Sequence, residues 1–345
     1  MIDLKTPRGL PVSVPASEAE DPSPRFQLSN IADALSYYRI HGYVVFKSLI
    51  AWDKCEEIKR LWHEEVKPSR SYIYRQATAK AERHLKNDQG WVVNPILNLQ
   101  SVCPREFRRF RQFSTDKIIT DSRLVSALEA ILGDRPKIVQ SMYFEGNSAT
   151  WEHQDTYYLD STDLGSMCGA WIALENIEPE AGRFFVCDRS HLIDMGLHSS
   201  ANNIADNHDA YIQSVVDVVR EKKLEIRAPA LRRGDVLFWN SKTIHGSLDT
   251  QDAGFSRSSI TVHAIPEQHQ FLQLQNRIKR LDLRSINGIP VHHPKDLASP
   301  ANRAVMWVES RYPTLFYGLK RAAVRAAIWR GRTFPITSPQ NGSRQ

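Results

Sequence analysis

Cysteine is scarce in this sequence and is not arranged for structural use. The four cysteines among 345 residues include no CxxC pair, and no secretory segment precedes them. A disulfide framework or a cysteine-based zinc site is therefore not expected. We interpret the cysteines as reduced thiols and expect a cytoplasmic protein.

Long apolar runs and nucleic-acid-binding signatures are missing too. No window approaches the roughly 18 to 20 consecutive apolar residues that a membrane-spanning helix needs. Zinc-finger, helix-turn-helix and RNA-binding motifs are absent, so we expect no nucleic-acid partner. With 41% hydrophobic residues the chain can bury a full core, which predicts a soluble protein with one large domain.

Positive charge is concentrated toward the C-terminus. The net charge is +6, yet residues 275–332 alone carry 12 Lys+Arg and 3 Asp+Glu. The simplest interpretation is a solvated basic surface, although such a surface also attracts anionic substrates or lipids. The segment Leu315–Arg330 mixes apolar and basic residues. It is either a docked terminal helix or an interfacial helix that rests peripherally on an anionic membrane or glycolipid.

Periodic patterns divide the chain into three parts. Residues 1–26 are rich in proline and have little apolar periodicity, which predicts an extended or disordered arm. Residues 27–270 form the main domain, which begins with helices predicted at 53–66 and 120–132 from apolar residues three and four positions apart. Residues 271–345 are expected to form a basic helical extension.

Within residues 137–266 the pattern changes to short β-rich runs separated by turns. The predicted strands are Lys137–Glu145, Met167–Leu174, Arg183–Cys187, Val236–Trp239 and Ser258–Ile265. Such strands favour a sandwich or a barrel, so the predicted fold class is mainly β with flanking helices. A helix predicted at 209–222 interrupts the strands, and we place it as a cover over the barrel mouth.

A histidine and an aspartate lie two residues apart in the segment Trp151-Glu-His-Gln-Asp155. On extended backbone, side chains at i and i+2 point to the same side, so His153 and Asp155 can reach one ion. His245 follows a later strand-like run and supplies a second imidazole. Two histidines and one carboxylate typify non-haem iron oxygenases, because three metal positions stay open for a chelating co-substrate and dioxygen. The HExxH helix typical of zinc proteases is absent.

A basic side chain completes the predicted site. Arg257 follows His245 by twelve residues and opens a strand. There its guanidinium can bind the far end of a dicarboxylate through two hydrogen bonds. If Arg257 points into a barrel, then Thr261 and His263 share its face. Ser247 shares the side of His245 and is a second candidate ligand for the same carboxylate.

Together these segments resemble the phytanoyl-CoA dioxygenase family of 2-oxoglutarate oxygenases. The matching pieces follow the family's order across residues 28–266 and are His41-Gly-Tyr-Val-Val-Phe46, Val139-Gln-Ser-Met-Tyr-Phe144, Trp151-Glu-His-Gln-Asp155, Gly169-Ala-Trp-Ile-Ala-Leu174, Gly182-Arg-Phe-Phe-Val186, Gly234-Asp-Val-Leu-Phe238, His245-Gly-Ser247 and Arg257-Ser258. The chain departs from the family at Cys187-Asp-Arg-Ser-His191, where the family often has Pro-Gly-Ser-His.

The resemblance implies a double-stranded β-helix (jelly-roll, cupin-like) core that uses Fe(II), 2-oxoglutarate and O2. The residues that it assigns to iron and catalysis are His153, Asp155 and His245. The residues that it assigns around 2-oxoglutarate are Gln140, Trp171, Ser247 and Arg257.

The expected activity is hydroxylation of an aliphatic carbon, with release of succinate and CO2. The substrate is expected to be small or lipid-like, and the basic segment suggests that it is anionic. Desaturation, epoxidation or ring closure would use the same residues. Two other classes stay open: a non-catalytic jelly-roll binding protein with a residual metal site, and a hydrolase or isomerase that uses another divalent metal. Candidate pocket residues are Tyr143, Tyr157, Tyr158, Trp171 and the loop 91–98.

Overall fold

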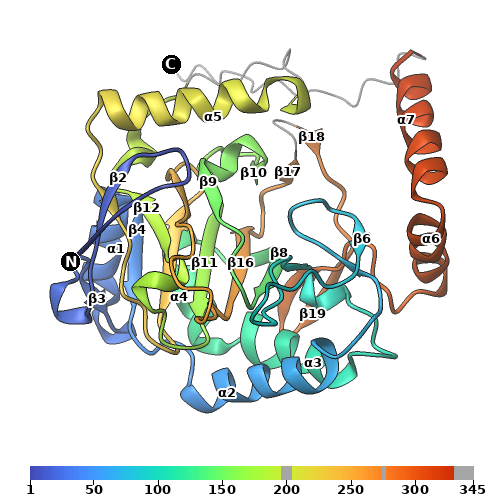
Figure 1. Cartoon of the computed structure of the whole chain (residues 1–345), viewed down its shortest axis with the longest axis horizontal. Helices are drawn as coiled ribbons and strands as arrows, with labels where there is room; N and C mark the ends of the chain where they lie inside the picture. Colours follow the sequence, from blue (N-terminus) through green and yellow to red (C-terminus); the bar gives the residue numbers. More distant parts are fainter. Residues whose placement is uncertain (196–203, 274–276, 330–345) are drawn as a thin grey trace, which may run out of the picture.

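Two β-sheets form the centre of the protein in a computed structural model that describes residues 1–195, 204–273 and 277–329 (Figure 1). In the larger sheet the consecutive neighbours are β8 (Pro136–Phe144), β16 (Ser259–Pro266), β11 (Cys168–Ala173), β14 (Val236–Asn240) and β4 (Tyr43–Phe46). In the smaller sheet they are β13 (Ile226–Arg227), β12 (Phe184–Cys187), β15 (His245–Ser247) and β9 (Thr150–His153).

The order of the strands confirms the predicted fold class. Strands β8, β11, β14 and β16 belong to the larger sheet, and β9, β12, β13 and β15, which alternate with them along the chain, belong to the smaller one. These pairs are antiparallel, which gives the double-stranded β-helix. The five predicted strands are all present, with ends that differ by a single residue.

Successive side chains of each strand point to opposite faces of the larger sheet, and each face is covered by its own apolar cluster. Val44 and Phe46 of β4 and Ile260 of β16 point outward into a core shared with the helices α1 (Ile31–His41), α2 (Trp52–Leu61) and α4 (Ser122–Leu132). Tyr43 and Val45 point inward, where they pack with residues of both sheets. The predicted helices at 53–66 and 120–132 are confirmed, the first continuing from α2 as a π-turn over Trp62–Val66.

The N-terminal arm is an ordered β-hairpin, so the disordered alternative is wrong for residues 2–14. Its strands β1 (Ile2–Lys5) and β2 (Pro11–Val14) pair with each other. Val12 and Val14 are buried against Phe185 and Leu248 of the barrel. The Thr6 hydroxyl, in the hairpin turn, donates to the buried carboxylate of Glu152. Val12 and Val14, which alternate with exposed residues between Pro11 and Pro15, form this buried face.

The prediction that residues after 270 are helical throughout is also wrong. Strands β17 (Phe271–Gln273), β18 (Arg277–Ile278), β19 (Leu283–Ile286) and β20 (Ile289–His292) come first, and β20 pairs with β8 of the larger sheet. Asn287 and Gly288, with φ of 50° and 82°, form the β19–β20 turn. An Asn-Gly pair between apolar residues is a strong hairpin signal that outweighs the basic composition. Residues 330–345 of the predicted extension lie outside the described residues.

Three helices lie apart from the layer formed by α1, α2 and α4. Helix α5 (Ile204–Glu221) runs across one end of the barrel, and α6 (Pro300–Arg311) and α7 (Pro313–Trp329) stand at one side (Figure 1). None of the helices in the described parts of the chain combines the length and apolar character that a membrane crossing requires.

Candidate metal centre

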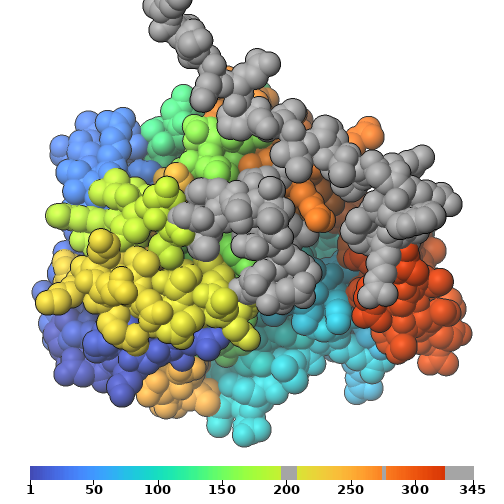
Figure 2. All heavy atoms as spheres, turned by 90° about the horizontal axis from the view of Figure 1, so that it is seen from above, coloured from blue at the N-terminus to red at the C-terminus, as the bar shows by residue number. Residues whose placement is uncertain are grey.

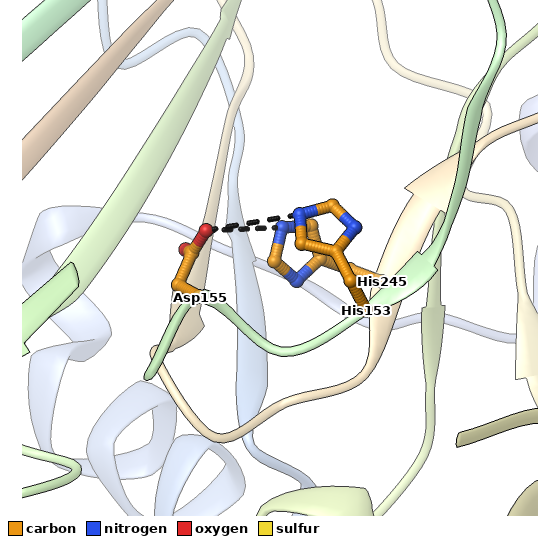
Figure 3. A group of neighbouring side chains, drawn as sticks. All are labelled: His153, Asp155 and His245. Carbon is orange, nitrogen blue, oxygen red and sulfur yellow. Dashed lines mark ion pairs between the residues drawn. The ribbon is translucent and has the colours of Figure 1, made fainter. Parts of the chain in front are cut away.

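The smaller sheet brings the two predicted histidines together. His153 ends β9 and His245 begins β15, and the two residues are direct partners in the antiparallel ladder. Their ring centroids are 4.3 Å apart. The backbone between His153 and Asp155 is extended at Gln154 (φ −106°, ψ 138°), so the carboxylate turns to the same side. One donor atom from each of the three residues lies within 4.8 Å of the other two (Figure 3).

Backbone carbonyls fix the tautomer of both histidines. Nδ1 of His153 lies 2.8 Å from the Trp151 carbonyl oxygen, and Nδ1 of His245 lies 2.9 Å from that of Thr243. Because a carbonyl only accepts, each Nδ1 carries the proton and each Nε2 presents its lone pair. The Nε2 atoms lie 3.8 Å and 3.6 Å from Oδ1 of Asp155. Burial lowers the pKa of His153 and lowers that of His245 to about 3, so both rings are neutral ligands at pH 7.

The other oxygen of Asp155 faces two ring nitrogens of the larger sheet, one of which is hydrogen-bonded to it. Trp239 Nε1–H donates to Oδ2 at 2.8 Å, and His263 Nε2 lies 3.3 Å from the same atom. Burial alone would raise the pKa of this carboxyl, but the nearby His245 and His263 imidazoles outweigh burial and lower it. Asp155 is therefore an anion whose Oδ1 faces the two histidine nitrogens.

Arg257 is a buried cation without a counter-charge. Its side chain is 2% exposed, and no carboxylate of the described residues lies within ion-pair distance. Nη1 donates to the Gly182 carbonyl at 3.0 Å, but Nε has no hydrogen-bond partner in the described parts of the chain. The rings of Phe144 and Trp171 lie 5.5 Å and 5.9 Å from the guanidinium carbon. Burial, uncompensated, lowers the pKa of Arg257 to about 9.

A second buried arginine, Arg183, has more hydrogen-bond acceptors than Arg257. Arg183 is equally buried, but two of its nitrogens donate to backbone carbonyls at 2.9 Å and 2.6 Å. Desolvating a guanidinium costs several kcal/mol unless an anion or a full set of acceptors compensates. Arg257 lacks both among the described residues, which indicates an anionic ligand.

The strand register places two other predicted residues on the inner face. Gln140 of β8 is opposite His263, and Trp171 of β11 is opposite Thr261. The inward face predicted for Thr261 and His263 is therefore present, with Ile260 on the outer side.

Ser247 and Tyr143 have contacts that differ from the roles expected for them, Ser247 beside 2-oxoglutarate and Tyr143 in the substrate pocket. The Ser247 hydroxyl accepts from the Thr150 backbone N–H at 2.9 Å and donates to Asn147 Oδ1 at 3.3 Å, so the one hydrogen that it could donate to a carboxylate is already engaged. Tyr143 stacks on Trp62, 4.3 Å between ring centroids, in the outer core. Tyr143 is therefore packing, and its assignment to the substrate pocket is wrong.

Sequence reasoning did not assign Trp239 or His263 to the site. Trp239 reaches Asp155 because Gly169, opposite it on β11, has no side chain: a Cβ there would lie 2.2 Å from the indole Cζ2. The signal in the sequence was a glycine within a buried strand, which often marks close approach of another group.

Helix α5 is hydrogen-bonded to the turn that carries the candidate metal ligands His153 and Asp155. The Tyr211 hydroxyl accepts from Gln154 N–H at 2.8 Å and donates to Gln154 O at 3.2 Å. The Tyr211 ring stacks on Tyr157 at 3.6 Å, and His208 Nε2 lies 2.7 Å from the Tyr158 hydroxyl. The predicted helix is thus present and packs against the turn between His153 and Asp155.

Comparison with known proteins gives concordant matches. A family model described as phytanoyl-CoA dioxygenase (PhyH) matches residues 38–258. The peroxisomal phytanoyl-CoA dioxygenase of Mus musculus is 24% identical over 278 residues, which cover 73% of this chain and 75% of that protein. Phytanoyl-CoA dioxygenase domain-containing protein 1 of Bos taurus is 29% identical over 157 residues, 43% of this chain and 51% of that protein.

A solved structure agrees on the fold. EctD from S. alaskensis, crystallised with 2-oxoglutarate and 5-hydroxyectoine, superposes with a TM-score of 0.51 at 14% identity, covering 76% of this chain and 88% of EctD.

Proposed function

Because the chain belongs to the phytanoyl-CoA dioxygenase family, we propose that it is an Fe(II)- and 2-oxoglutarate-dependent oxygenase. One observation carries the proposal: a His-Asp-His cluster, in which Asp155 and His245 are buried, shares the barrel with Arg257, a buried guanidinium that has no counter-charge among the described residues. A metal site alone would fit many proteins, whereas a metal site with an anion receptor fits a chelating co-substrate.

The three donor groups fit Fe(II). Two neutral Nε2 atoms and one carboxylate oxygen form a facial set that leaves positions for a co-substrate and dioxygen. We propose His153, Asp155 and His245 as the iron ligands. The carbonyl bonds to both Nδ1–H groups and the hydrogen bond from Trp239 to Asp155 Oδ2 hold these groups in orientation before any ion binds.

We propose that Arg257 binds the co-substrate. Its guanidinium suits the distal carboxylate of 2-oxoglutarate, and that carboxylate would supply the missing counter-charge. The Trp171 ring lies against the guanidinium, and Gln140 shares the inner face. We propose both as neighbours of the co-substrate. Ser247 stays a prediction with less support, because Thr150 and Asn147 already engage its hydroxyl.

When bound, Fe(II) would activate O2, and 2-oxoglutarate would be the reductant: its oxidative decarboxylation to succinate and CO2 would take up one oxygen atom and leave the other for the substrate. The protein's own residues orient the ligands, keep both imidazoles neutral and bury the site away from water. The finer proposal is hydroxylation of an aliphatic carbon in a small or lipid-like, anionic substrate. We further propose a cytoplasmic enzyme whose catalytic domain reaches from residue 27 to the end of β20 at His292.

The test is an anaerobic titration of metal-free protein with Fe(II) and 2-oxoglutarate. We expect the weak visible charge-transfer band of an iron-chelated 2-oxo acid in the wild type. His245→Ala is expected to lose iron binding, and Arg257→Ala is expected to bind iron but need far more 2-oxoglutarate for the band. A folded wild type without any band would favour the non-catalytic binding protein or the hydrolase or isomerase with another metal.

A further inference from the structure

Exposed apolar side chains gather on the last two helices. Among the described residues, 15 large apolar side chains are exposed, and six of them lie between residues 305 and 319. These six, named here the α6–α7 face, are Val305, Trp307, Val308, Tyr312, Leu315 and Leu319, between 38% and 63% exposed. Figure 2 shows the two helices in red as a corner at the edge of the molecule. Isolated exposed apolar residues are ordinary, but a contiguous group indicates a binding surface.

The exposed charges that α6 and α7 carry on this face are positive. Arg311, Lys320 and Arg321 are exposed, and Lys80 lies over the ring of Tyr317 beside them. The sole carboxylate between residues 297 and 322 is Glu309. Glu309 is 3% exposed, and its oxygens accept from Tyr74, Ala81 and Tyr317, which fixes α6 to the domain and removes that charge from the surface.

The sign of these charges decides between two occupants. A second copy of the chain, pairing this face with itself, would bring Arg311, Lys320 and Arg321 toward the same residues of its partner, with no exposed acid on the face to pair with them. A surface of anionic lipid complements both the apolar side chains and the positive charges of the face. Tryptophan and tyrosine settle at the headgroup level, leucine enters the acyl region, and lysine and arginine are attracted to anionic headgroups.

We propose that the α6–α7 face is a peripheral membrane-binding surface that takes anionic lipid. The surface lies in residues 305–321, outside the segment matched by the family and outside the metal centre. It holds the enzyme at a lipid surface without spanning it, and it is independent of the iron and co-substrate sites.

Sedimentation of the full-length protein with phospholipid vesicles tests this. We expect binding to vesicles of phosphatidylcholine with about one-third phosphatidylserine, little binding to phosphatidylcholine alone, and loss of binding at high salt. Lys320→Gln with Arg321→Gln should lower the partition coefficient by about 25-fold, because each cation near an anionic surface contributes about fivefold. Leu315→Ala with Leu319→Ala should lower it by at least about tenfold.

Trp52→Ala is the matched control, because Trp52 is 64% exposed on α2, far along the chain from this face, and should not change binding. Equal thermal unfolding midpoints would show that the variants are folded. Two results would overturn the proposal. One is equal binding by wild type and both double variants. The other is a concentration-dependent dimer that Leu315→Ala with Leu319→Ala abolishes in the absence of lipid, which would make a second copy the occupant.

Discussion

The indole Nε1–H of Trp239 donates a 2.8 Å hydrogen bond to Oδ2 of Asp155, the carboxylate oxygen turned away from the two histidine nitrogens. His263 lies 3.3 Å from the same oxygen. Both rings belong to the larger sheet, whereas both histidines of the cluster belong to the smaller one. The candidate metal centre therefore joins the two sheets, and the orientation of Asp155 depends on strands that carry none of the three proposed ligands.

Replacing Trp239 should weaken iron binding without removing a ligand. Trp239→Phe keeps an aromatic ring between the sheets but removes the donor to Oδ2, so Asp155 can rotate. Loss of such a supporting hydrogen bond typically costs 10- to 100-fold in metal affinity, and we expect a decrease in that range. Equilibrium titration of the metal-free protein with Fe(II), followed without substrate, measures it.

Trp52→Phe, a similar change at an exposed position, is the control and should leave the Fe(II) affinity unchanged. An affinity of Trp239→Phe within about twofold of wild type would show that His263 and the backbone alone orient Asp155, contrary to the role that we assign to the indole.

Arg257→Lys should separate co-substrate binding from iron binding. Lysine keeps the charge but loses the planar fork that matches a carboxylate through two bonds. We expect the dissociation constant of 2-oxoglutarate to rise by about 10- to 100-fold while the Fe(II) affinity changes little. Arg183→Lys makes the same change at a buried arginine whose bonds go to backbone carbonyls. If both variants lose 2-oxoglutarate affinity equally, the effect is general destabilisation rather than lost recognition.

The stability of the protein should fall as the pH decreases below about 6.5 because of His84. Its Nε2–H donates to the Val66 carbonyl at 2.8 Å, and its Nδ1 lies 3.2 Å from Arg75 Nη2. Burial, and secondarily Arg75, lowers the pKa of His84 from 6.5 to about 4. Between these values the unfolded chain binds a proton that the folded protein does not, so stability is full above pH 6.5 and is lost toward pH 4.

Urea denaturation at several pH values between 7 and 4.5 tests this, with His84→Gln as the comparison. The difference in the free energy of unfolding between wild type and variant should shrink as the pH falls. A difference that stays constant over this interval would mean that His84 takes up its proton equally in both states.

The strands were predictable because each is a short β-branched or aromatic run that ends in a clear turn. Gly182, in the left-handed conformation with φ of 82°, precedes β12, and Gly234, with φ of 84°, precedes β14. Two of the three proposed iron ligands, His153 and Asp155, were predictable from the local pattern because they are near neighbours on extended backbone. That His245 lies opposite His153 depends on which strands pair, which no local pattern reveals.

The residues that were missed act through contacts between distant strands. Trp239 on β14 can donate to Asp155 only because Gly169 on β11 leaves room for its ring. In the sequence alone, Trp239 is one more aromatic residue of a buried strand. The hairpin at Asn287 and Gly288 is a different case, because an Asn-Gly pair between apolar residues is a local signal that predicts the turn without reference to distant strands.

Tyr211→Phe should reveal how far α5 supports the metal centre. The Tyr211 hydroxyl bridges the backbone N–H and C=O of Gln154, the residue between His153 and Asp155. Phenylalanine keeps the stack on Tyr157 but leaves a buried N–H without its acceptor, which should lower the free energy of unfolding by about 1 to 3 kcal/mol. Because Gln154 joins the proposed ligands His153 and Asp155, a looser Gln154 backbone should lower the Fe(II) affinity as well. Unfolding in urea and Fe(II) titration of the same preparation separate the two effects: reduced stability with unchanged iron affinity would show that α5 holds the fold but not the geometry of the ligands.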